Sequence, residues 1–280
     1  MMKLLISLFV IASSLILFAT TKSQRPEARI GTNEKAPLTS ESRDAAPVPV
    51  IVELFTSEGC SSCPPADEVL AQLDKTQPVP GAQIIALGEH VDYWNRLGWV
   101  DPFSSAEFSR RQSEYADAFS NDSVYTPQMI VDGHDEFAGG SMSRAREAIV
   151  RATQTPKANV SLIPSPGSNQ NEISLSVQIS DLPRMAASQV ADVFLAITEN
   201  NLRSEVPRGE NAGRSLRHSA VTRRLDLLGQ ISPDQNSFKA LPTVNLANGW
   251  SKSNLRAVVF VQEHSSRRIL GAATLGLSAR

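Results

Sequence analysis

Two cysteines three positions apart are the residues whose chemistry can be named first. Cys60 and Cys63 are the two cysteines of the 280-residue chain, in the stretch FTSEGCSSCPPAD. In a first helical turn this spacing puts both side chains on one face, where the sulfurs can close a small ring or open as a dithiol. Backbone N–H groups at a helix start lower the pKa of a nearby thiol. We therefore expect Cys60 to attack and Cys63 to resolve.

The two prolines after the pair affect where the helix begins. Pro64 biases the preceding Cys63 away from helical backbone angles, and neither Pro64 nor Pro65 donates a backbone hydrogen bond. Proline is tolerated in the first turn of a helix, so we expect regular helix to begin at one of them. Cys60 would then lie in the entering turn, where the helix dipole acts on it more weakly.

The elements around the cysteines follow from apolar patterning. Residues 48–55 are almost continuously apolar, as in a strand buried on both faces, and the cysteines follow directly. Further along we predict a helix over 66–75, a strand over 83–87, a helix over 104–120 with Ser104 or Ser105 as its N-cap, short strands over 129–131 and 136–138, and a helix over 141–153. This is the element order of a thioredoxin-like α/β domain, which we place at residues 48–155.

After Pro156 the pattern changes to that of strands. Residues 171–181 alternate strictly between apolar and polar, and the runs 193–197, 255–261 and 269–277 also indicate strands. We expect residues 157–280 to form a mostly antiparallel, sandwich-like β domain.

The N-terminal segment indicates export. Residues 1–21 contain Lys3 and an apolar run, which is typical of a signal peptide or an uncleaved N-terminal anchor. Both alternatives predict a location outside the cytoplasm, periplasmic or secreted, with membrane attachment only if the segment is uncleaved. Residues 22–47 are rich in charged residues, Pro, Ser and Thr, and we expect a flexible linker. The net charge of −2 gives no electrostatic case for nucleic-acid binding.

Four separated motifs resemble a known family. The stretches VELFTSEGCSSCPPAD, HVDYWNRLGWVDPF, VYTPQMIVDG and GENAGRSLRHSAV are similar to the exported bacterial family catalogued as domain of unknown function 1223, with a thioredoxin-like fold. The resemblance implies a CxxC site at Cys60 and Cys63 with Pro127 opposite. In thioredoxin-like domains a cis-proline at this place faces the cysteines, and the residue before it, here Thr126, offers its backbone to an extended substrate. The resemblance supplies no substrate.

Other polar and aromatic residues are candidates for accessory roles. His90 or Asp92 could accept a proton from the resolving thiol, although a hydrogen-bonded structural role is the alternative. Trp94 belongs to an aromatic segment that suits a lid, an interdomain contact or the edge of a hydrophobic peptide groove. Arg217 and His218, together with Asn211 and Arg214, either form a solvated charged face or dock against the cysteine domain.

Two classes of function remain open from the sequence. The first is an exported thiol-disulfide oxidoreductase that acts on protein thiols or disulfides, with a redox partner protein and no organic cofactor. The second is a non-catalytic binding module whose cysteines form a structural disulfide or hold copper(I) with Met129. The scattered histidines, His90, His134, His218 and His264, lack the paired ligand spacing of a zinc site.

Overall fold

The computed structural model describes residues 46–167 and 171–278. Its helices are α1 (Pro64–Thr76), α2 (Ala106–Phe119) and α3 (Met142–Ala152), with short 3₁₀ helices η1 (Asn95–Leu97) and η2 (Lys252–Asn254). Its strands are β1 (Val48–Thr56), β2 (Ala82–His90), β3 (Gln128–Val131), β4 (Asp135–Ala138), β5 (Asn159–Pro164), β6 (Glu172–Ser180), β7 (Ala191–Glu199), β8 (Leu202–Val206), β9 (Arg214–His218), β10 (Val221–Ile231), β11 (Phe238–Ala240), β12 (Thr243–Asn245), β13 (Leu255–Glu263) and β14 (Ile269–Gly276).

The expected N-terminal leader or anchor, residues 1–21, lies outside the described residues, as does the expected linker apart from its last two positions. Within the two described ranges, every helix is too short or too polar to cross a membrane.

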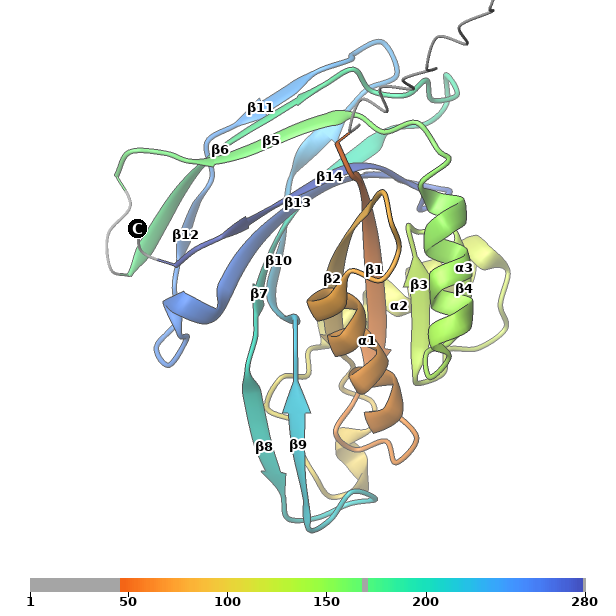
Figure 1. Ribbon diagram of the computed structural model, residues 1–280, viewed down its shortest axis with the longest axis vertical. Coiled ribbons are helices and arrows are strands. Elements are labelled where there is room, and N and C mark those ends of the chain that lie inside the picture. Colours follow the sequence, from red (N-terminus) through yellow and green to blue (C-terminus); the bar gives the residue numbers. More distant parts are fainter. Residues whose placement is uncertain (1–45, 168–170, 279–280) are drawn as a thin grey trace, which may run out of the picture. The chain divides into compact units, whose positions relative to one another are not determined.

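An eight-stranded mixed sheet forms the centre of the structure (Figure 1). Its strand order is β14-β13-β7-β10-β2-β1-β3-β4. Strand β1 pairs in parallel with β2 and antiparallel with β3, so both of its edges are hydrogen-bonded. Residues 50–56 of β1 are all buried, which explains why this strand is almost continuously apolar.

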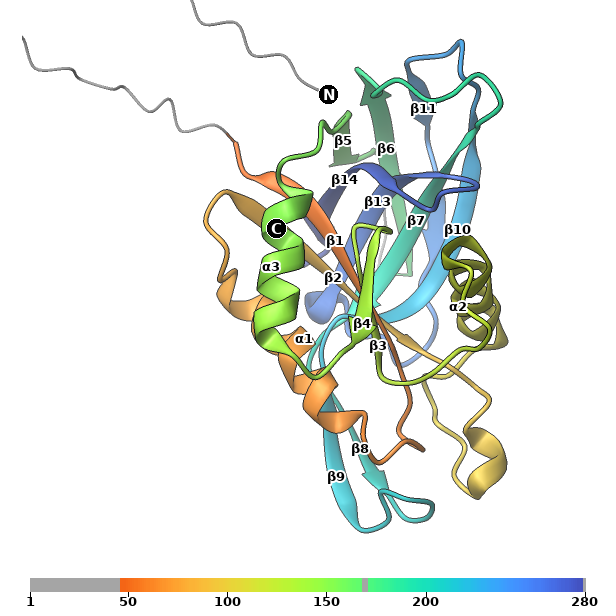
Figure 2. The same ribbon diagram turned by 90° about the vertical axis from the view of Figure 1, so that its right-hand side faces the viewer.

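Helices cover both faces of the sheet around β1 (Figure 2). Helices α1 and α3 lie on one side and α2 lies on the other. Alternation along β1 assigns the side chains: Val52 and Leu54 pack in the core with α1 and α3, whereas Ile51 packs in a core with Phe108 of α2. Each fully buried aliphatic side chain of this kind contributes roughly 1.5–3 kcal/mol. The two cores together fix β1 and, at its end, the loop that carries the cysteines.

The two ranges expected as domains, 48–155 and 157–280, contribute strands to this same sheet. They meet where β10 runs in parallel beside β2, at the register pair Val221 and Gly88. The Gly88 N–H donates to the Ala220 carbonyl at 2.7 Å. The described residues, 46–167 and 171–278, accordingly form one compact unit, and the predicted boundary near residue 156 lies inside it.

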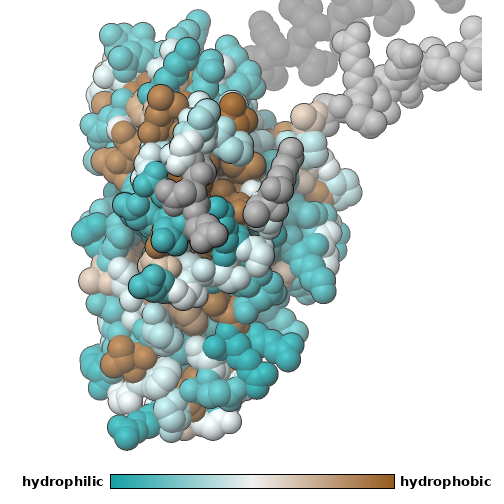
Figure 3. All heavy atoms as spheres, turned by 90° about the vertical axis from the view of Figure 1, so that its left-hand side faces the viewer, coloured by the Kyte–Doolittle hydropathy of each residue, from teal (hydrophilic) through white to brown (hydrophobic). Residues whose placement is uncertain are grey.

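A smaller sheet covers the strands of the large sheet that come from the second range. Strand β6 is its central strand and pairs with β5, β11 and β12. The alternation predicted for β6 is confirmed, because its apolar side chains Ile173, Leu175, Val177 and Ile179 are all buried. They pack against β7 and β13 in one core, so the second range is built as one sheet layer on another. On the face shown in Figure 3, hydrophobic and hydrophilic side chains are interspersed.

A charged cluster is buried between β1, β2 and α2. The Arg111 guanidinium lies 2.6 Å from the Glu53 carboxylate and 3.5 Å from the Glu89 carboxylate. Tyr115 donates a short hydrogen bond to Glu53 and accepts one from Gln262 at 2.8 Å. Burial, and then the neighbouring Glu53 carboxylate, raise the pKa of Glu89 well above its usual value. Glu89 is therefore the neutral member of the carboxyl pair, and Arg111 balances Glu53.

We predict that Glu89→Gln changes how stability depends on pH. Because the pKa of Glu89 is raised on folding, the wild-type protein loses stability as pH rises from the unfolded pKa of about 4.3 toward the folded value. Glutamine has no proton to lose. The free energy of unfolding of the variant, relative to that of wild type, should therefore rise by up to about 1.4 kcal/mol per pH unit over that interval. Urea unfolding between pH 4 and pH 8 measures the difference. The exposed Glu68→Gln on α1 is the control, and parallel profiles for wild type and Glu89→Gln would contradict a neutral Glu89.

The turn between β3 and β4 holds the two ranges together at the far end of β3. Gly133 has φ +68°, and a Cβ there would lie 1.8 Å from the Arg267 carbonyl oxygen. The neighbouring Asp132 carbonyl accepts the Ile269 N–H at 3.0 Å, and its carboxylate pairs with Lys157. Glycine is required here by both the backbone angle and the close approach.

We predict that Gly133→Ala destabilises the fold by roughly 2–4 kcal/mol, because the methyl group must displace the Arg267 backbone and alanine disfavours positive φ. The urea midpoint measures this loss. Gly140→Ala is the matched control, since a Cβ at Gly140 meets no atom within 4 Å. Equal midpoints for the two variants would contradict the proposed contact.

Candidate functional site

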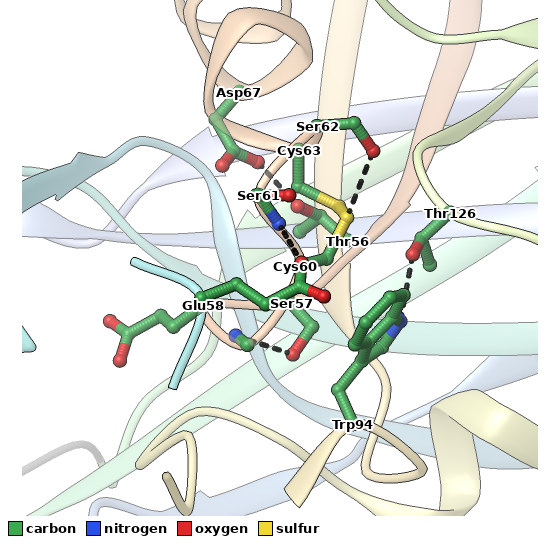
Figure 4. The surroundings of a disulfide bond; sticks show 12 residues. Thr56, Ser57, Glu58, Cys60, Ser61, Ser62, Cys63, Asp67, Trp94 and Thr126 are labelled. Carbon is green, nitrogen blue, oxygen red and sulfur yellow. Dashed lines mark hydrogen bonds between the residues drawn. A yellow bond between two sulfur atoms is a disulfide. The ribbon is translucent and has the colours of Figure 1, made fainter. Parts of the chain in front are cut away.

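Cys60 and Cys63 form a disulfide at the junction of β1 and α1 (Figure 4). Helix α1 begins at Pro64, as the sequence predicts. Cys63 nevertheless has helical angles, φ −76° and ψ −39°, which differs from the extended backbone expected before a proline. The reason lies in its hydrogen bonds: its N–H donates to the Cys60 carbonyl at 3.2 Å, and its own carbonyl accepts from Ala66 and Asp67. Cys63 thus belongs to two consecutive turns.

The peptide bond between Thr126 and Pro127 is cis, as expected. The Trp94 indole N–H donates to the Thr126 hydroxyl at 2.8 Å, and both side chains lie beside the disulfide in Figure 4. Gly139 donates its N–H to the Pro127 carbonyl at 3.0 Å, which ties this loop to the segment after β4.

Trp94 of the same chain occupies the space beside Gly59. A Cβ on Gly59 would lie 2.9 Å from the Trp94 Cβ, so this glycine makes room for Trp94. Both cysteines are 0% exposed. A reagent therefore reaches either sulfur only after nearby groups move.

A loop from the second range holds the cysteine loop in place. Residues 207–213 connect β8 to β9, and the Asn211 side-chain amide donates to the carbonyls of Glu58 and Cys60, each at 2.9 Å. Asn211 is buried, and Arg214 donates to its side-chain oxygen at 2.8 Å. The expected docking of Asn211 and Arg214 against the cysteine segment is therefore present.

The adjacent residue in this loop contacts the sequence between the cysteines. The Ser61 N–H donates to the Glu210 carboxylate at 2.9 Å. Hydrogen bonds from the Ser61 hydroxyl and backbone lower the pKa of Glu210, so it is charged at neutral pH.

Behind the cysteine loop is a group of buried histidines and carboxylates. His218 Nε2 lies 3.0 Å from the Glu58 carboxylate, and His90 Nδ1 lies 2.7 Å from Asp101. The His90 and His218 rings are in edge contact, 4.9 Å between centroids. Burial lowers the pKa of His90, but the Asp101 carboxylate opposes this and the net pKa is raised. The two sequence candidates His90 and His218 are thus brought together, from β2 and β9.

Asp67 of α1 faces the same interior. It accepts a hydrogen bond from the Thr56 hydroxyl at 2.7 Å, and with His90 and His218 it lines a small void. Burial raises the pKa of Asp67, and the two histidines oppose that rise. Asp67 ends the cysteine motif of the sequence, which by itself assigns it no role.

Two of the predicted accessory residues lie elsewhere. Asp92 accepts a hydrogen bond from Ser109 of α2 at 2.6 Å, on the other side of the sheet from α1. Arg217 is exposed on β9. Met129, the suggested copper ligand, is buried in the core with Leu54. Among the described residues no group of three or more His, Cys, Asp or Glu side chains is arranged to hold a metal ion.

Sequence reasoning missed the residues that support the site from behind. Glu58 accepts a hydrogen bond from the Trp99 indole at 2.7 Å, and its N–H donates to Asp101 at 2.8 Å. The available signal was local: Glu58 and Asp67 are the acidic residues that flank the cysteine stretch on either side. Their role depended on His218, which is 160 positions away from Glu58.

The comparisons with known proteins identify a family and a fold. The sequence model of the family described as "Protein of unknown function (DUF1223)" matches residues 51–262. No curated protein matches. The crystal structure of protein AGR_C_4864 from Agrobacterium tumefaciens is 27% identical, covers 84% of this chain and 98% of its own, and has a TM-score of 0.64. HBP35 of Porphyromonas gingivalis is 16% identical, with 84% and 77% covered and a TM-score of 0.60, which shows similarity of fold alone.

We predict that Asn211→Ala destabilises the protein by roughly 2–4 kcal/mol, since it leaves the carbonyls of Glu58 and Cys60 without their shared donor. Urea unfolding measures the loss. Arg217→Ala, on the exposed side of β9, should stay within about 0.5 kcal/mol of wild type. If Asn211→Ala is as stable as Arg217→Ala, the loop does not hold the cysteine segment.

Proposed function

The chain belongs to the DUF1223 family, and we propose that it is a thiol-disulfide oxidoreductase of thioredoxin-like type that acts on proteins outside the cytoplasm. The observation that carries the proposal is the Cys60–Cys63 disulfide at a strand-to-helix junction, beside a cis Thr126–Pro127 bond. The export signal read in residues 1–21 supports the location.

In the proposed reaction, the reduced protein transfers two electrons to a substrate disulfide. The Cys60 thiolate attacks one substrate sulfur, a mixed disulfide forms, and the other substrate sulfur leaves as a thiolate that takes up a proton. The Cys63 thiolate then attacks the Cys60 sulfur, which releases the second substrate thiolate and forms the Cys60–Cys63 disulfide. A partner protein that carries a dithiol reduces this disulfide again. In the opposite direction the same steps oxidise a substrate dithiol.

The residues around the pair have distinct roles in this proposal. Cys60 precedes the helix and is the nucleophile, whereas Cys63 is the N-cap residue of α1 and is the resolving thiol. Thr126 and Pro127 position the substrate chain. Trp94, which is hydrogen-bonded to Thr126, must shift when a polypeptide binds there.

A second candidate function is favoured by a different observation. Both cysteines are 0% exposed, which suits a structural disulfide in a non-catalytic binding module. The two candidates differ in whether Cys60 becomes reactive after reduction.

We predict that reduced Cys63→Ser protein, mixed with oxidised glutathione, accumulates a mixed disulfide at Cys60, since the resolving thiol is absent. Wild type should accumulate little of it, because Cys63 displaces the glutathione. Mass spectrometry after acid quenching measures both. Cys60→Ser is the matched control and should form no more adduct than wild type. If Cys60 resists both alkylation and glutathione after mild reduction, the oxidoreductase proposal fails and the structural disulfide is favoured.

A further inference from the structure

Two backbone N–H groups near Cys60 donate to acceptors other than its sulfur, which affects the stability of a Cys60 thiolate. In a CxxC loop these groups can stabilise the negative charge on the first sulfur. Here the Ser61 N–H donates to Glu210, and the Cys63 N–H donates to the Cys60 carbonyl. The prolines at the next two positions, Pro64 and Pro65, have no N–H to offer. The Ser62 hydroxyl lies 3.3 Å from the Cys60 sulfur, so the loop keeps this side-chain donor for a thiolate while the Ser61 and Cys63 N–H groups donate elsewhere.

Glu210 adds a negative charge to this position. Its carboxylate binds the backbone of the residue directly after Cys60. The loop that carries it is fixed by the neighbouring Asn211, whose side chain bonds to the Glu58 and Cys60 carbonyls. Glu210 thus remains beside the cysteine pair because the side chain of the next residue, Asn211, anchors the loop there.

We propose that the Glu210 carboxylate disfavours the thiolate of reduced Cys60, and so makes the CxxC pair a stronger reductant than it would be without the loop between β8 and β9. The negative charge of Glu210 repels the negative charge that forms on Cys60, and the Ser61 N–H is already taken. Destabilising the reduced form favours the disulfide, which lowers the reduction potential. Glu210 is a positioning residue in this sense, since it acts on Cys60 through the Ser61 amide and through its charge.

The test compares Glu210→Gln with a matched variant on the same hairpin. Glu205→Gln removes an exposed carboxylate that pairs with Arg203 on β8 instead of binding the cysteine loop. In the Cys63→Ser background, the pH dependence of Cys60 alkylation by iodoacetamide reports the acidity of the thiol. We expect Glu210→Gln to raise the thiolate fraction below the pKa about threefold to tenfold, and Glu205→Gln to leave it unchanged.

With both cysteines present, equilibration in glutathione buffers at a pH above the Cys60 pKa, where the reduced pair carries the thiolate, should show Glu210→Gln to be less reducing than wild type by a similar factor, where tenfold corresponds to about 30 mV. Because Glu210 is exposed, the difference should shrink in 1 M salt, where the screening length is about 3 Å. An unchanged thiol acidity in Glu210→Gln, an equal change in Glu205→Gln, or a difference that persists at high salt would each overturn the proposal.

The inference rests on the proposed function but fails separately from it. The alkylation measurement needs no protein substrate and no turnover, so it reads the effect of Glu210 even in a protein that reduces no substrate disulfide. Conversely, the Cys60 mixed disulfide can form in Cys63→Ser while Cys60 is equally acidic with and without Glu210→Gln. That result would support the oxidoreductase proposal and exclude the role of Glu210.

Discussion

The short parallel contact between β2 and β10 determines how the rest of the site is assembled. At this point Gly88 donates its N–H to the Ala220 carbonyl, and a Cβ on Gly88 would come within 3.4 Å of that oxygen. The contact sets the position of the residues just before β10, so His218 enters the interior beneath the cysteine loop. It also directs the β8–β9 hairpin along α1, as Figure 1 shows. The loop that binds the Glu58 and Cys60 carbonyls lies at the end of that hairpin.

Local features of the structure were predictable from the sequence, and long-range ones were not. The alternation in 171–181, the helix start at Pro64 and the cis bond before Pro127 each follow from a few neighbouring residues or from family resemblance. The pairing of β2 with β10 has no local signal, because one register pair joins segments more than a hundred residues apart. The docking of Asn211 was predicted only as one of two alternatives. Asp67 and Glu58 were missed since His218, which lies near both, comes from the distant strand β9.

Buried charges recur on both faces of the sheet, and their partners differ. Under α2, Glu53 is balanced by Arg111 and Tyr115, which are both on that helix. Under the cysteine loop, the carboxylates of Glu58 and Asp101 are paired with histidines. An arginine stays charged at all ordinary pH values, whereas a histidine changes charge near neutrality. The first cluster is therefore suited to holding structure, and in the second the Asp101 carboxylate raises the pKa of His90.

The anchoring of the cysteine loop by Asn211 has a consequence for synthesis of the chain. Asn211 bonds to Cys60 across 151 sequence positions, so a growing polypeptide has made both cysteines long before their clamp exists. During that interval the segment around Glu58 lacks the donor that later satisfies its carbonyl. Closure of this loop therefore follows synthesis of Asn211, and an N-terminal fragment that ends before Asn211 would present an unclamped cysteine pair.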